Sequence, residues 1–348
     1  MGTRTGCQPQ WNIIAPTVEL LFIGHVWSHY RAALRQRLGD RHRLAFFGTV
    51  SEPGVAEGVK TAQVIVANGL PADLGRTADD LRLVQGGGSG VNQFHMDSVR
   101  EGVPLSRTLH HGPSMAEHVL MVMLALQRDL LGLDRDLREG RWRNAAHNPD
   151  AGLQSSLEGS TVVVLGTGEI GLHVAARCRP LGLRVIGVNR RGLEPEGGRF
   201  DEIRVWTRLD ETLPDADFLV VAVPLNEETR GMVNGPRLER MKEQAFLVAI
   251  SRGPVVDEEA LYTALEQRRI AGAAIDVWYE YPRSPGQATR PSAFPFEGLD
   301  NVIMTPHSSG MTEATFDRRI DDIVDNIERL ERGEPLRHVV AVGERRHL

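Results

Sequence analysis

The sequence predicts an α/β protein made of two doubly wound parallel-sheet domains. Short apolar runs alternate with amphipathic stretches along the chain, which is the pattern of repeated β-α-β units. The length of 348 residues suits roughly two domains with separate cores. The composition, 41% apolar and 25% charged, is ordinary for a globular protein. A net charge of −6 without a long Lys/Arg run disfavours a dedicated nucleic-acid-binding protein.

In the first half of the chain, apolar runs bounded by polar residues indicate strands. They are expected at Glu19–Ile23, Arg43–Phe47, Gln63–Ala67, Leu81–Gln85 and Pro104–Thr108. Helical periodicity is expected at Tyr30–Leu38, at Met96–Glu101, and from about Pro113 to Glu139. Proline suits the first turn of that long helix. Residues 141–156 are polar and contain Asn148-Pro149, so we expect a loop there.

A second β-α series is expected from Ser160 onward. Its strands are expected at Thr161–Leu165, Val185–Val188, Phe218–Val223, Phe246–Ile250, Ala273–Val277 and Val302–Thr305. The proline-rich segment 281–298 indicates a functional loop rather than a linker. A final amphipathic helix is expected over 313–332, since Gly333 and Pro335 follow it.

Several features bear on compartment. The two cysteines, Cys7 and Cys178, are too few for a disulfide scaffold, so a reducing compartment is expected. The longest apolar runs, such as 119–126, are shorter than the roughly 18–20 residues that span a bilayer. The polar first sixteen residues do not resemble a signal peptide. We therefore expect a soluble cytoplasmic protein, and no residue cluster suggests a metal site.

A glycine-rich turn follows the strand at 161–165 and begins a helix expected to run to about Leu181. It reads Gly166-Thr167-Gly168-Glu169-Ile170-Gly171. The first glycine permits a tight turn, the second lets the backbone approach a pyrophosphate, and the third lets the helix pack on the strand. The helix N-terminus adds N–H groups for the phosphates. This context predicts a Rossmann-type dinucleotide site, with an ordinary glycine-rich turn as the alternative.

The end of the next strand bears on which dinucleotide is bound. NAD-specific sites usually have Asp or Glu there, for the ribose hydroxyls. This chain has Asn189-Arg190-Arg191. Arginine can give a 2′-phosphate charge-assisted hydrogen bonds of about 1.5–3 kcal/mol each. NADP(H) is therefore the expected cofactor and NAD(H) a possible one, unless both arginines only face solvent.

Three residues with catalytic potential follow three later strands. Arg252 lies in Ile250-Ser251-Arg252, Asp276 begins Asp276-Val277-Trp278, and His307 ends Thr305-Pro306-His307. Open α/β sheets bind ligands at the carboxyl ends of their strands. The joint placement favours a catalytic site over separate surface and capping roles.

With the glycine motif and Ser114-Met115-Ala116-Glu117-His118, these segments resemble the D-isomer-specific 2-hydroxyacid dehydrogenase family. The resemblance covers about residues 80–335, and the first 80 residues only by pattern. It implies a Rossmann domain of residues 113–311 inserted in a flavodoxin-like substrate domain of residues 1–112 and 312–348. It also implies a small-molecule substrate and a homodimer, with contact through the Rossmann domain and the helix at 113–139.

The resemblance also implies roles for single residues. Arg252 would hold the substrate carboxylate and carbonyl oxygen, and His307 would donate a proton to that oxygen or accept it in reverse. The second carboxylate anchor would be backbone amides of Gly88–Asn92, which include Ser89, Gly90 and Val91. The expected nicotinamide contacts are Asp276, the Ile250 carbonyl, Ser309 and Gly310, and those of the adenosine-side loop are Pro224 and Thr229.

One position departs from the family pattern. The family places a glutamate five residues after the aspartate and directly before a proline, to pair with the histidine. Here Tyr281 occupies that position before Pro282, and Glu280 lies one residue away. A carboxylate would raise the histidine pKa, whereas a neutral phenol only orients the ring. We expect an acid-shifted pH profile for reduction, and both Tyr281 and Glu280 remain candidate partners of His307.

The leading hypothesis is an NADP(H)-preferring enzyme that interconverts small 2-oxo acids and D-2-hydroxy acids. Some basic side chains are either solvated or, where two or three converge, suited to a substrate with a second anion. They are His25, His29, Arg31, His110, His111, Arg141 and Arg143. One alternative is a formate- or phosphite-type dehydrogenase, because formate dehydrogenases of this superfamily also lack the acid and share an Asp-Val-Trp run. The other is a dinucleotide-sensing, corepressor-like protein.

Overall fold

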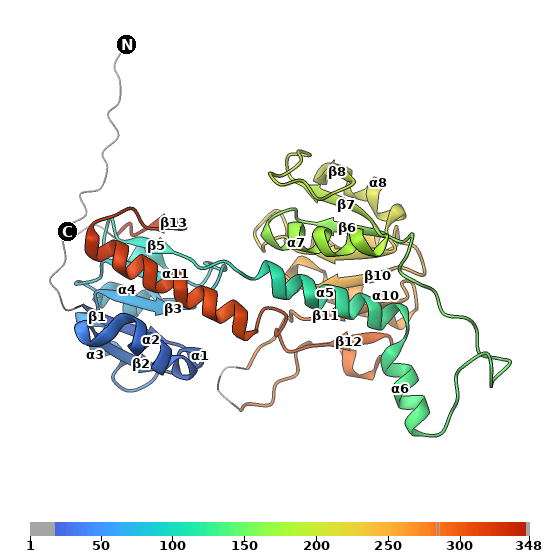
Figure 1. Ribbon diagram of the computed structural model, residues 1–348, viewed down its shortest axis with the longest axis horizontal. Helices are drawn as coiled ribbons and strands as arrows, with labels where there is room; N and C mark the ends of the chain where they lie inside the picture. Colours follow the sequence, from blue (N-terminus) through green and yellow to red (C-terminus); the bar gives the residue numbers. More distant parts are fainter. Residues whose placement is uncertain (1–17, 283, 285, 346–348) are drawn as a thin grey trace, which may run out of the picture. The chain divides into compact units, whose positions relative to one another are not determined.

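The computed structural model describes residues 18–282, 284 and 286–345, which form two compact units (Figure 1). Unit 1 contains the described residues up to His110 and those from Glu313 onward, and unit 2 runs from His111 to Thr312. Each unit is a mainly parallel sheet with an apolar core on both faces. The predicted class of two α/β parallel-sheet domains is confirmed.

The sheet of unit 1 has the strand order β13-β5-β4-β3-β1-β2. Its strands are β1 (Glu19–Ile23), β2 (Arg43–Phe47), β3 (Val64–Ala67), β4 (Leu83–Gly86), β5 (Pro104–Ser106) and β13 (Val339–Val342). Leu21 and Ile23 pack on one face of the sheet, and Leu20 and Phe22 on the other. The sequence did not predict β13, which pairs antiparallel with β5 at the edge. Its side chains are mostly exposed, so it lacks the alternation that indicates a half-buried strand.

The described residues of unit 1 form five α-helices, which flank this sheet. They are α1 (His25–His29), α2 (Arg31–Leu38), α3 (Val55–Thr61), α4 (Ala72–Thr77) and α11 (Glu313–Arg332). The helix expected at 96–101 is only a 3₁₀ turn, Met96–Ser98. Backbone groups of the next residues pair instead with Arg345, which donates to the Val99 carbonyl and accepts from Glu101.

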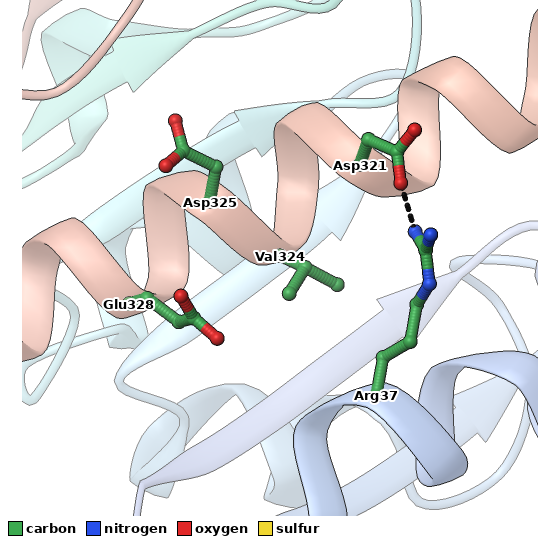
Figure 2. A pocket seen from close by; sticks show the side chains of 5 residues that line it. All are labelled: Arg37, Asp321, Val324, Asp325 and Glu328. Atoms are coloured by element: carbon green, nitrogen blue, oxygen red, sulfur yellow. Dashed lines mark ion pairs between the residues drawn. The ribbon is translucent and has the colours of Figure 1, made fainter.

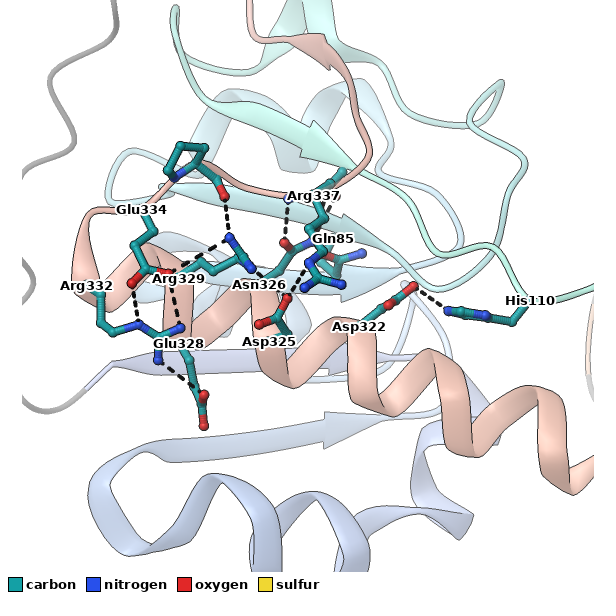
Figure 3. A network of polar contacts seen from close by, with 12 residues as sticks. Gln85, His110, Asp322, Asp325, Asn326, Glu328, Arg329, Arg332, Glu334 and Arg337 are labelled. Atoms are coloured by element: carbon teal, nitrogen blue, oxygen red, sulfur yellow. Dashed lines mark hydrogen bonds and ion pairs between the residues drawn. The ribbon is translucent and has the colours of Figure 1, made fainter. Parts of the chain in front are cut away.

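The carboxyl-terminal helix α11 is fixed to unit 1 by a buried polar network (Figure 3). The fully buried Asn326 donates to Gln85 Oε1 and to Ser106 Oγ, each at 2.9 Å, and accepts the Arg337 amide at 2.8 Å. One turn earlier, Asp322 pairs with His110 Nε2 at 2.8 Å. Satisfied polar groups in a core make strong, specific contacts. These contacts of Asn326 and Asp322 explain why the chain returns to unit 1 after Thr312.

A shallow groove lies between α2 and α11 (Figure 2). The ion pair of Arg37 with Asp321 spans it, and Val324, Asp325 and Glu328 complete its lining. None of the residues that the sequence assigns to catalysis or cofactor binding lines this groove. It is an acidic surface feature of unit 1.

The sheet of unit 2 has the order β12-β11-β10-β9-β6-β7-β8, with every neighbouring pair parallel. The strands are β6 (Thr161–Leu165), β7 (Arg184–Asn189), β8 (Glu202–Val205), β9 (Phe218–Val221), β10 (Phe246–Ala249), β11 (Gly272–Ile275) and β12 (Val302–Met304). The chain proceeds outward from β6 to β8, then continues from β9 on the other side of β6. Ligands of open α/β sheets bind at such a switch point. The unpredicted β8 is half-buried and carries two charged residues, which weakens its strand signal.

The helices of unit 2 are α5 (Gly112–Gln127), α6 (Leu130–Arg138), α7 (Glu169–Cys178), α8 (Leu209–Thr212), α9 (Gly235–Leu238) and α10 (Glu258–Glu266). The prediction of a single helix over 113–139 is therefore wrong. The helix is interrupted at Asp129, whose φ is 43°. Aspartate visits the left-handed region more easily than most residues. Met115, Val119, Val122 and Met123 of α5 enter the core, whereas Leu130, Leu131 and Leu137 of α6 are exposed. The apolar periodicity of the sequence thus continues from α5 into α6, although the leucines of α6 lie outside the core.

Membrane-spanning helices, metal-binding clusters and cysteines can be assessed in the described residues. Within them, no helix is long and apolar enough to cross a membrane. No group of three or more His, Cys, Asp or Glu side chains in the same residues is arranged to hold a metal ion. Cys178 is a buried free thiol whose pKa is raised by burial to about 12. Cys7 lies outside the described residues.

Candidate active site

The residues that the sequence selects in unit 2 follow the carboxyl ends of six neighbouring strands. In sheet order these are His307 after β12, Asp276 after β11, Arg252 after β10, Pro224 after β9, Gly166 after β6 and Asn189 at the end of β7. Strands lie about 4.8 Å apart, so the six ends extend over roughly 24 Å. We call the ends of β12, β11 and β10 the catalytic end, and the ends of β9, β6 and β7 the adenosine end.

The glycine-rich turn follows β6, which lies between β9 and β7 at the adenosine end. Gly166 has φ 108°, and a Cβ there would lie 2.9 Å from the Ala222 carbonyl carbon. A Cβ on Gly171 would lie 2.1 Å from the Gly166 oxygen, so neither site admits a side chain. A Cβ on Gly168 would instead project into open space at the start of α7. That open backbone fits the approach of a pyrophosphate to a helix N-terminus.

The side chains of Glu169 and Ile170 are used inside unit 2. Glu169 Oε1 accepts the Gly112 amide at 3.1 Å, at the first residue of α5. Ile170 packs against the core beneath α7. What these two residues can offer a phosphate is therefore their backbone at the helix N-terminus.

At the adenosine end, the side-chain amide of Asn189 is fully engaged with its own turn and with the glycine-rich turn. Its Nδ2 donates to Thr167 Oγ1 at 2.9 Å and to the Leu193 carbonyl at 2.8 Å. Its Oδ1 accepts the amides of Arg191 at 3.0 Å and Gly192 at 2.7 Å. These four bonds use the whole capacity of the amide. Asn189 therefore shapes the turn and has no group left for a ribose.

The two arginines after Asn189 are exposed. Arg190 forms an ion pair with Glu228, and its guanidinium carbon lies 5.2 Å from the centre of the Trp206 ring. Arg191 is exposed, and no described side chain pairs with its guanidinium. The adenosine end thus presents two cations, of which one already has an acidic partner.

The loop after β9 is held by Thr229, which is 3% exposed. Its hydroxyl donates to the Pro224 carbonyl at 2.6 Å, and its amide donates to Asn226 Oδ1 at 3.0 Å. Thr229 thus fixes the conformation of the Pro224–Thr229 segment.

At the catalytic end, the buried carboxylate of Asp276 organises the loop that contains His307. Its Oδ1 accepts the Thr305 hydroxyl at 2.6 Å and the Ser308 amide at 2.8 Å, and its Oδ2 accepts the Ser309 amide at 3.0 Å. Burial alone would raise the pKa of Asp276, but hydrogen bonding from Ser309, Thr305 and Ser308 holds it below its usual value. His307 has φ 55°, a conformation that surrounding contacts must impose. The bonds from Asp276 to the residues on either side of His307 supply that constraint.

His307 lies beside a cation without an acidic partner. Burial lowers the pKa of His307, the positive charge of Arg252 lowers it further, and Asp276 opposes both effects. Arg252 Nη1 donates to the Ser251 carbonyl at 2.6 Å. None of the described acids forms an ion pair with Arg252. The pair therefore offers positive charge and a proton-transfer group to an anion.

The contact of His307 is with Tyr281 rather than with Glu280. The Tyr281 hydroxyl lies 3.1 Å from His307 Nδ1 and also accepts the Trp278 amide at 3.1 Å. Glu280 is exposed, and its backbone amide donates to the Pro291 carbonyl at 3.0 Å. The loop thus turns the phenol toward the histidine.

Comparison with known proteins agrees with this geometry. Residues 120–309 match the family model for the D-isomer specific 2-hydroxyacid dehydrogenase, NAD binding domain. The glyoxylate reductase of Korarchaeum cryptofilum is 31% identical over 296 residues, covering 82% of this chain and 84% of that protein. The chain belongs to the D-isomer-specific 2-hydroxyacid dehydrogenase family.

Solved structures resemble this dehydrogenase over nearly its whole length. A D-isomer specific 2-hydroxyacid dehydrogenase family protein of Aeromonas salmonicida has a TM-score of 0.78 and 27% identity, over 93% of this chain and 99% of that one. An NADPH-dependent glyoxylate/hydroxypyruvate reductase of Sinorhizobium meliloti, in complex with NADP and malonate, has a TM-score of 0.75 and 25% identity. The match covers 95% of this chain and 99% of that reductase chain.

These matches confirm the predicted family and enzyme class. The dehydrogenase is an NAD(P)-dependent oxidoreductase of the 2-hydroxyacid type. They support that interpretation over the formate- or phosphite-type and corepressor-like alternatives.

Sequence reasoning missed several residues at both ends of the site. Ser251 has a buried hydroxyl with no described hydrogen-bond partner, beside Ile250 and Arg252, where a carboxamide could be bound. Thr305 could have been found, because a hydroxyl directly before Pro306-His307 lies at a strand end. Trp206 stands in no recognisable motif. Glu228 lies within the Pro224–Thr229 segment, but nothing in its pattern distinguished it from an ordinary surface residue.

The loop expected to bind a carboxylate lies in unit 1, after β4. The Gly88 carbonyl accepts the Thr108 amide at 3.3 Å, and the Ser89 carbonyl accepts Arg107 Nη1 at 3.5 Å. A Cβ on Gly87 would lie 2.4 Å from the buried Trp27 ring, so the loop begins closely packed. These contacts shape the backbone at Ser89, Gly90 and Val91.

The basic side chains considered for a second anion mostly have other partners. Arg141 pairs with Asp136 and Glu139 on and after α6, and Arg143 pairs with Asp129 and Asp136. His110 pairs with Asp322, and the Arg31 guanidinium carbon lies 4.9 Å from the Phe46 ring centre. His25 and His29 are exposed, and His111 is partly buried in unit 2. The described contacts therefore do not form a second anion site from this set.

Proposed function

We propose that the dehydrogenase reduces small 2-oxo acids to D-2-hydroxy acids, and catalyses the reverse oxidation, with NADP(H) preferred over NAD(H). The observation that carries this proposal is the unpaired guanidinium of Arg252 beside His307, at the same sheet edge as the open Gly168 turn. The names of the glyoxylate and hydroxypyruvate reductases among its relatives support the choice of small 2-oxo acids.

Each catalytic residue has a task suited to its chemistry. The planar guanidinium of Arg252 would bind the substrate carboxylate and polarise the carbonyl oxygen. Protonated His307 would donate its proton to that oxygen, and neutral His307 would accept it in the oxidation. For the second carboxylate contact we propose the backbone amides of Ser89, Gly90 and Val91. When bound, the reduced dinucleotide supplies the hydride that the carbonyl carbon receives.

The cofactor contacts follow the sheet edge. Asp276, the Ile250 carbonyl, Ser309 and Gly310 would hold the carboxamide at the catalytic end. Gly166–Gly171 would receive the pyrophosphate, and Pro224–Thr229 would border the adenosine. NADP(H) is preferred in this proposal because no acid stands at the end of β7 and Arg191 has no described side-chain partner, so it is available to a 2′-phosphate. Arg190 would exchange its ion pair with Glu228 for the same phosphate. Unit 2 is then the cofactor domain and unit 1 the substrate domain.

We also propose a homodimer in the cytoplasm, where a buried thiol such as Cys178 stays reduced. An apolar surface of unit 2 is exposed on α5, α6 and the segment after them. Its members are Met121, Leu124, Leu130, Leu131, Leu137 and Trp142. A second copy of this chain is the occupant that the family resemblance implies, and covering these side chains would remove them from water. Leu131→Glu should shift the protein toward monomers in sedimentation analysis, whereas Leu193→Glu, at an exposed leucine outside this surface, should not.

The proposed reaction is tested by the loss of reduced-nicotinamide absorbance, with NADPH and NADH in parallel. The substrates are glyoxylate, pyruvate, hydroxypyruvate, oxaloacetate and phosphonopyruvate. Turnover with NADPH on at least one monoanionic 2-oxo acid is the expected result. Better turnover on the last two compounds would indicate a second anion in the natural substrate. Saturable NADPH binding without turnover on any compound would contradict the proposed function.

A further inference from the structure

We propose that the Tyr281 hydroxyl donates its hydrogen to Nδ1 of neutral His307 and so keeps the imidazole hydrogen on Nε2. Tyr281 is then a positioning residue, because it acts through His307. The inference rests on the proposed role of His307 in proton transfer. It concerns the form of the histidine that the enzyme holds before substrate protonation.

The contacts of the phenol oxygen leave few arrangements. A tyrosine hydroxyl has one hydrogen to donate and two acceptor sites. The Trp278 amide, 3.1 Å away, can only donate, so it occupies one acceptor site. One hydrogen and one acceptor site then remain for His307 Nδ1, at 3.1 Å. The ring centres are 5.7 Å apart and tilted by 54°, so the contact is through the hydroxyl and not by stacking.

The charges around the pair favour two neutral partners. Burial raises the pKa of Tyr281, which keeps its hydroxyl protonated. Burial and the nearby charge of Arg252 lower the pKa of His307, against the opposing effect of Asp276. Asp276 already accepts three hydrogen bonds from the loop around His307. Between a neutral phenol and a neutral imidazole, the phenol is the better donor and the imidazole nitrogen the better acceptor.

A carboxylate at this position would act in the opposite sense. An ionised carboxylate only accepts hydrogen bonds, so it would hold a hydrogen on Nδ1 and leave Nε2 bare in the neutral histidine. It would also stabilise the imidazolium by Coulomb attraction. With Tyr281, adding the second proton to His307 requires the hydroxyl to turn from donor to acceptor. Reduction by this enzyme therefore needs a lower pH than reduction by a carboxylate-partnered variant.

The tautomer can be measured without activity. Nitrogen-15 NMR of histidine-labelled enzyme at a pH where His307 is neutral distinguishes Nε2–H from Nδ1–H, and the resonances that vanish in His307→Gln assign the residue. The expected spectrum shows Nε2–H in the wild type and Nδ1–H in Tyr281→Glu. Tyr281→Phe should give a mixture of both forms. Glu280→Gln is the matched control, because Glu280 is exposed one residue away and should leave the tautomer unchanged.

The pH profile of kcat/KM gives a second measurement on the same variants. The apparent pKa for 2-oxo acid reduction should rise by about 1–3 units in Tyr281→Glu, as for an ionisable group given an opposite charge nearby. A purely structural role would lower kcat without moving the tautomer or the apparent pKa, and would overturn the proposal. An Nδ1–H wild-type His307, or a tautomer that changes in Glu280→Gln, would also overturn it. Absence of all turnover with an Nε2–H His307 would contradict the proposed function but not the Tyr281 contact.

Discussion

The two ends of the sheet edge in unit 2 are built in different ways. At the catalytic end, Asp276 is 1% exposed and accepts three hydrogen bonds from a single loop. At the adenosine end, Arg190 is held by an exposed ion pair and by the face of Trp206. Buried polar networks lose much when one member is removed, whereas exposed ion pairs contribute at most about 1 kcal/mol. In the proposed function, the catalytic contacts are therefore fixed by the fold, and the proposed cofactor selectivity depends on side chains that can change at little cost.

The largest effect is expected at the catalytic end, from His307→Gln. Glutamine cannot supply the proton, so kcat should fall by about 10²–10⁴-fold, the usual contribution of a general acid. The dissociation constant for NADPH, measured by fluorescence titration, should change little. His29→Gln is a control because His29 is exposed in unit 1. An unchanged kcat would exclude His307 from proton transfer.

Asp276→Asn should have the next largest effect. An amide has one oxygen with two acceptor sites, so it cannot accept the Thr305 hydroxyl and both loop amides. The loop that holds His307 at φ 55° would then relax, and we expect kcat to fall by roughly 10–10²-fold, an estimate from one unsatisfied buried group at about 1–3 kcal/mol. Removing the anion also removes the contribution that raises the pKa of His307, so the pH profile for reduction should move to lower pH.

Thr305→Val separates the two parts of that effect. It removes one of the hydrogen bonds to Asp276 and keeps the carboxylate charge. We expect a smaller loss of kcat than in Asp276→Asn. Steady-state kinetics across pH compares the two variants. An equal loss in both would indicate that the loop depends on the Thr305 hydroxyl rather than on the charge of Asp276.

The sequence was most informative where chemistry and fold coincide. Gly166, Asp276 and Pro306-His307 directly follow apolar runs, because the carboxyl ends of parallel strands place such residues at one edge of the sheet. The sequence therefore predicted both the strands and the candidate site residues. The break at Asp129 was not, since the apolar periodicity of α5 continues into a helix whose leucines are exposed. The edge strand β13 depends on pairing with β5, far away in the chain. Local patterns do not contain such pairings.

The same limit applies to the contacts of the site. The sequence left open whether Tyr281 or Glu280 contacts His307. In an extended chain the two neighbouring side chains point to opposite sides, so only the conformation of the loop decides between them. The ion pair of Arg190 with Glu228 joins residues 38 positions apart, and neither residue type is rare on a surface. The adenosine end was therefore predicted as two free arginines, and the structure shows that one of them has a partner.

The arginines themselves should have an intermediate effect on cofactor choice. Replacing Arg190 and Arg191 together by Ala should raise the KM for NADPH about tenfold more than the KM for NADH, since one charge-assisted bond contributes about 1.5 kcal/mol or more. Arg199→Ala is a suitable control, because Arg199 is an exposed arginine of the same unit. Equal changes with both cofactors would contradict the NADP(H) assignment.

The smallest expected effect concerns Glu228. Its carboxylate competes with a 2′-phosphate for Arg190, so Glu228→Gln should free that cation and lower the KM for NADPH while leaving the KM for NADH nearly unchanged. An exposed ion pair contributes about 0.2–1 kcal/mol, which corresponds to a change of about 1.4- to 5-fold. Glu227→Gln is the matched control, since Glu227 is exposed beside it and no described cation pairs with it. Added salt screens exposed ion pairs, so the difference between Glu228→Gln and the wild type should shrink as ionic strength rises. If Glu228→Gln instead raised the KM for NADH alone, its carboxylate would be a ribose contact, and the adenosine end would bind both cofactors through opposite charges.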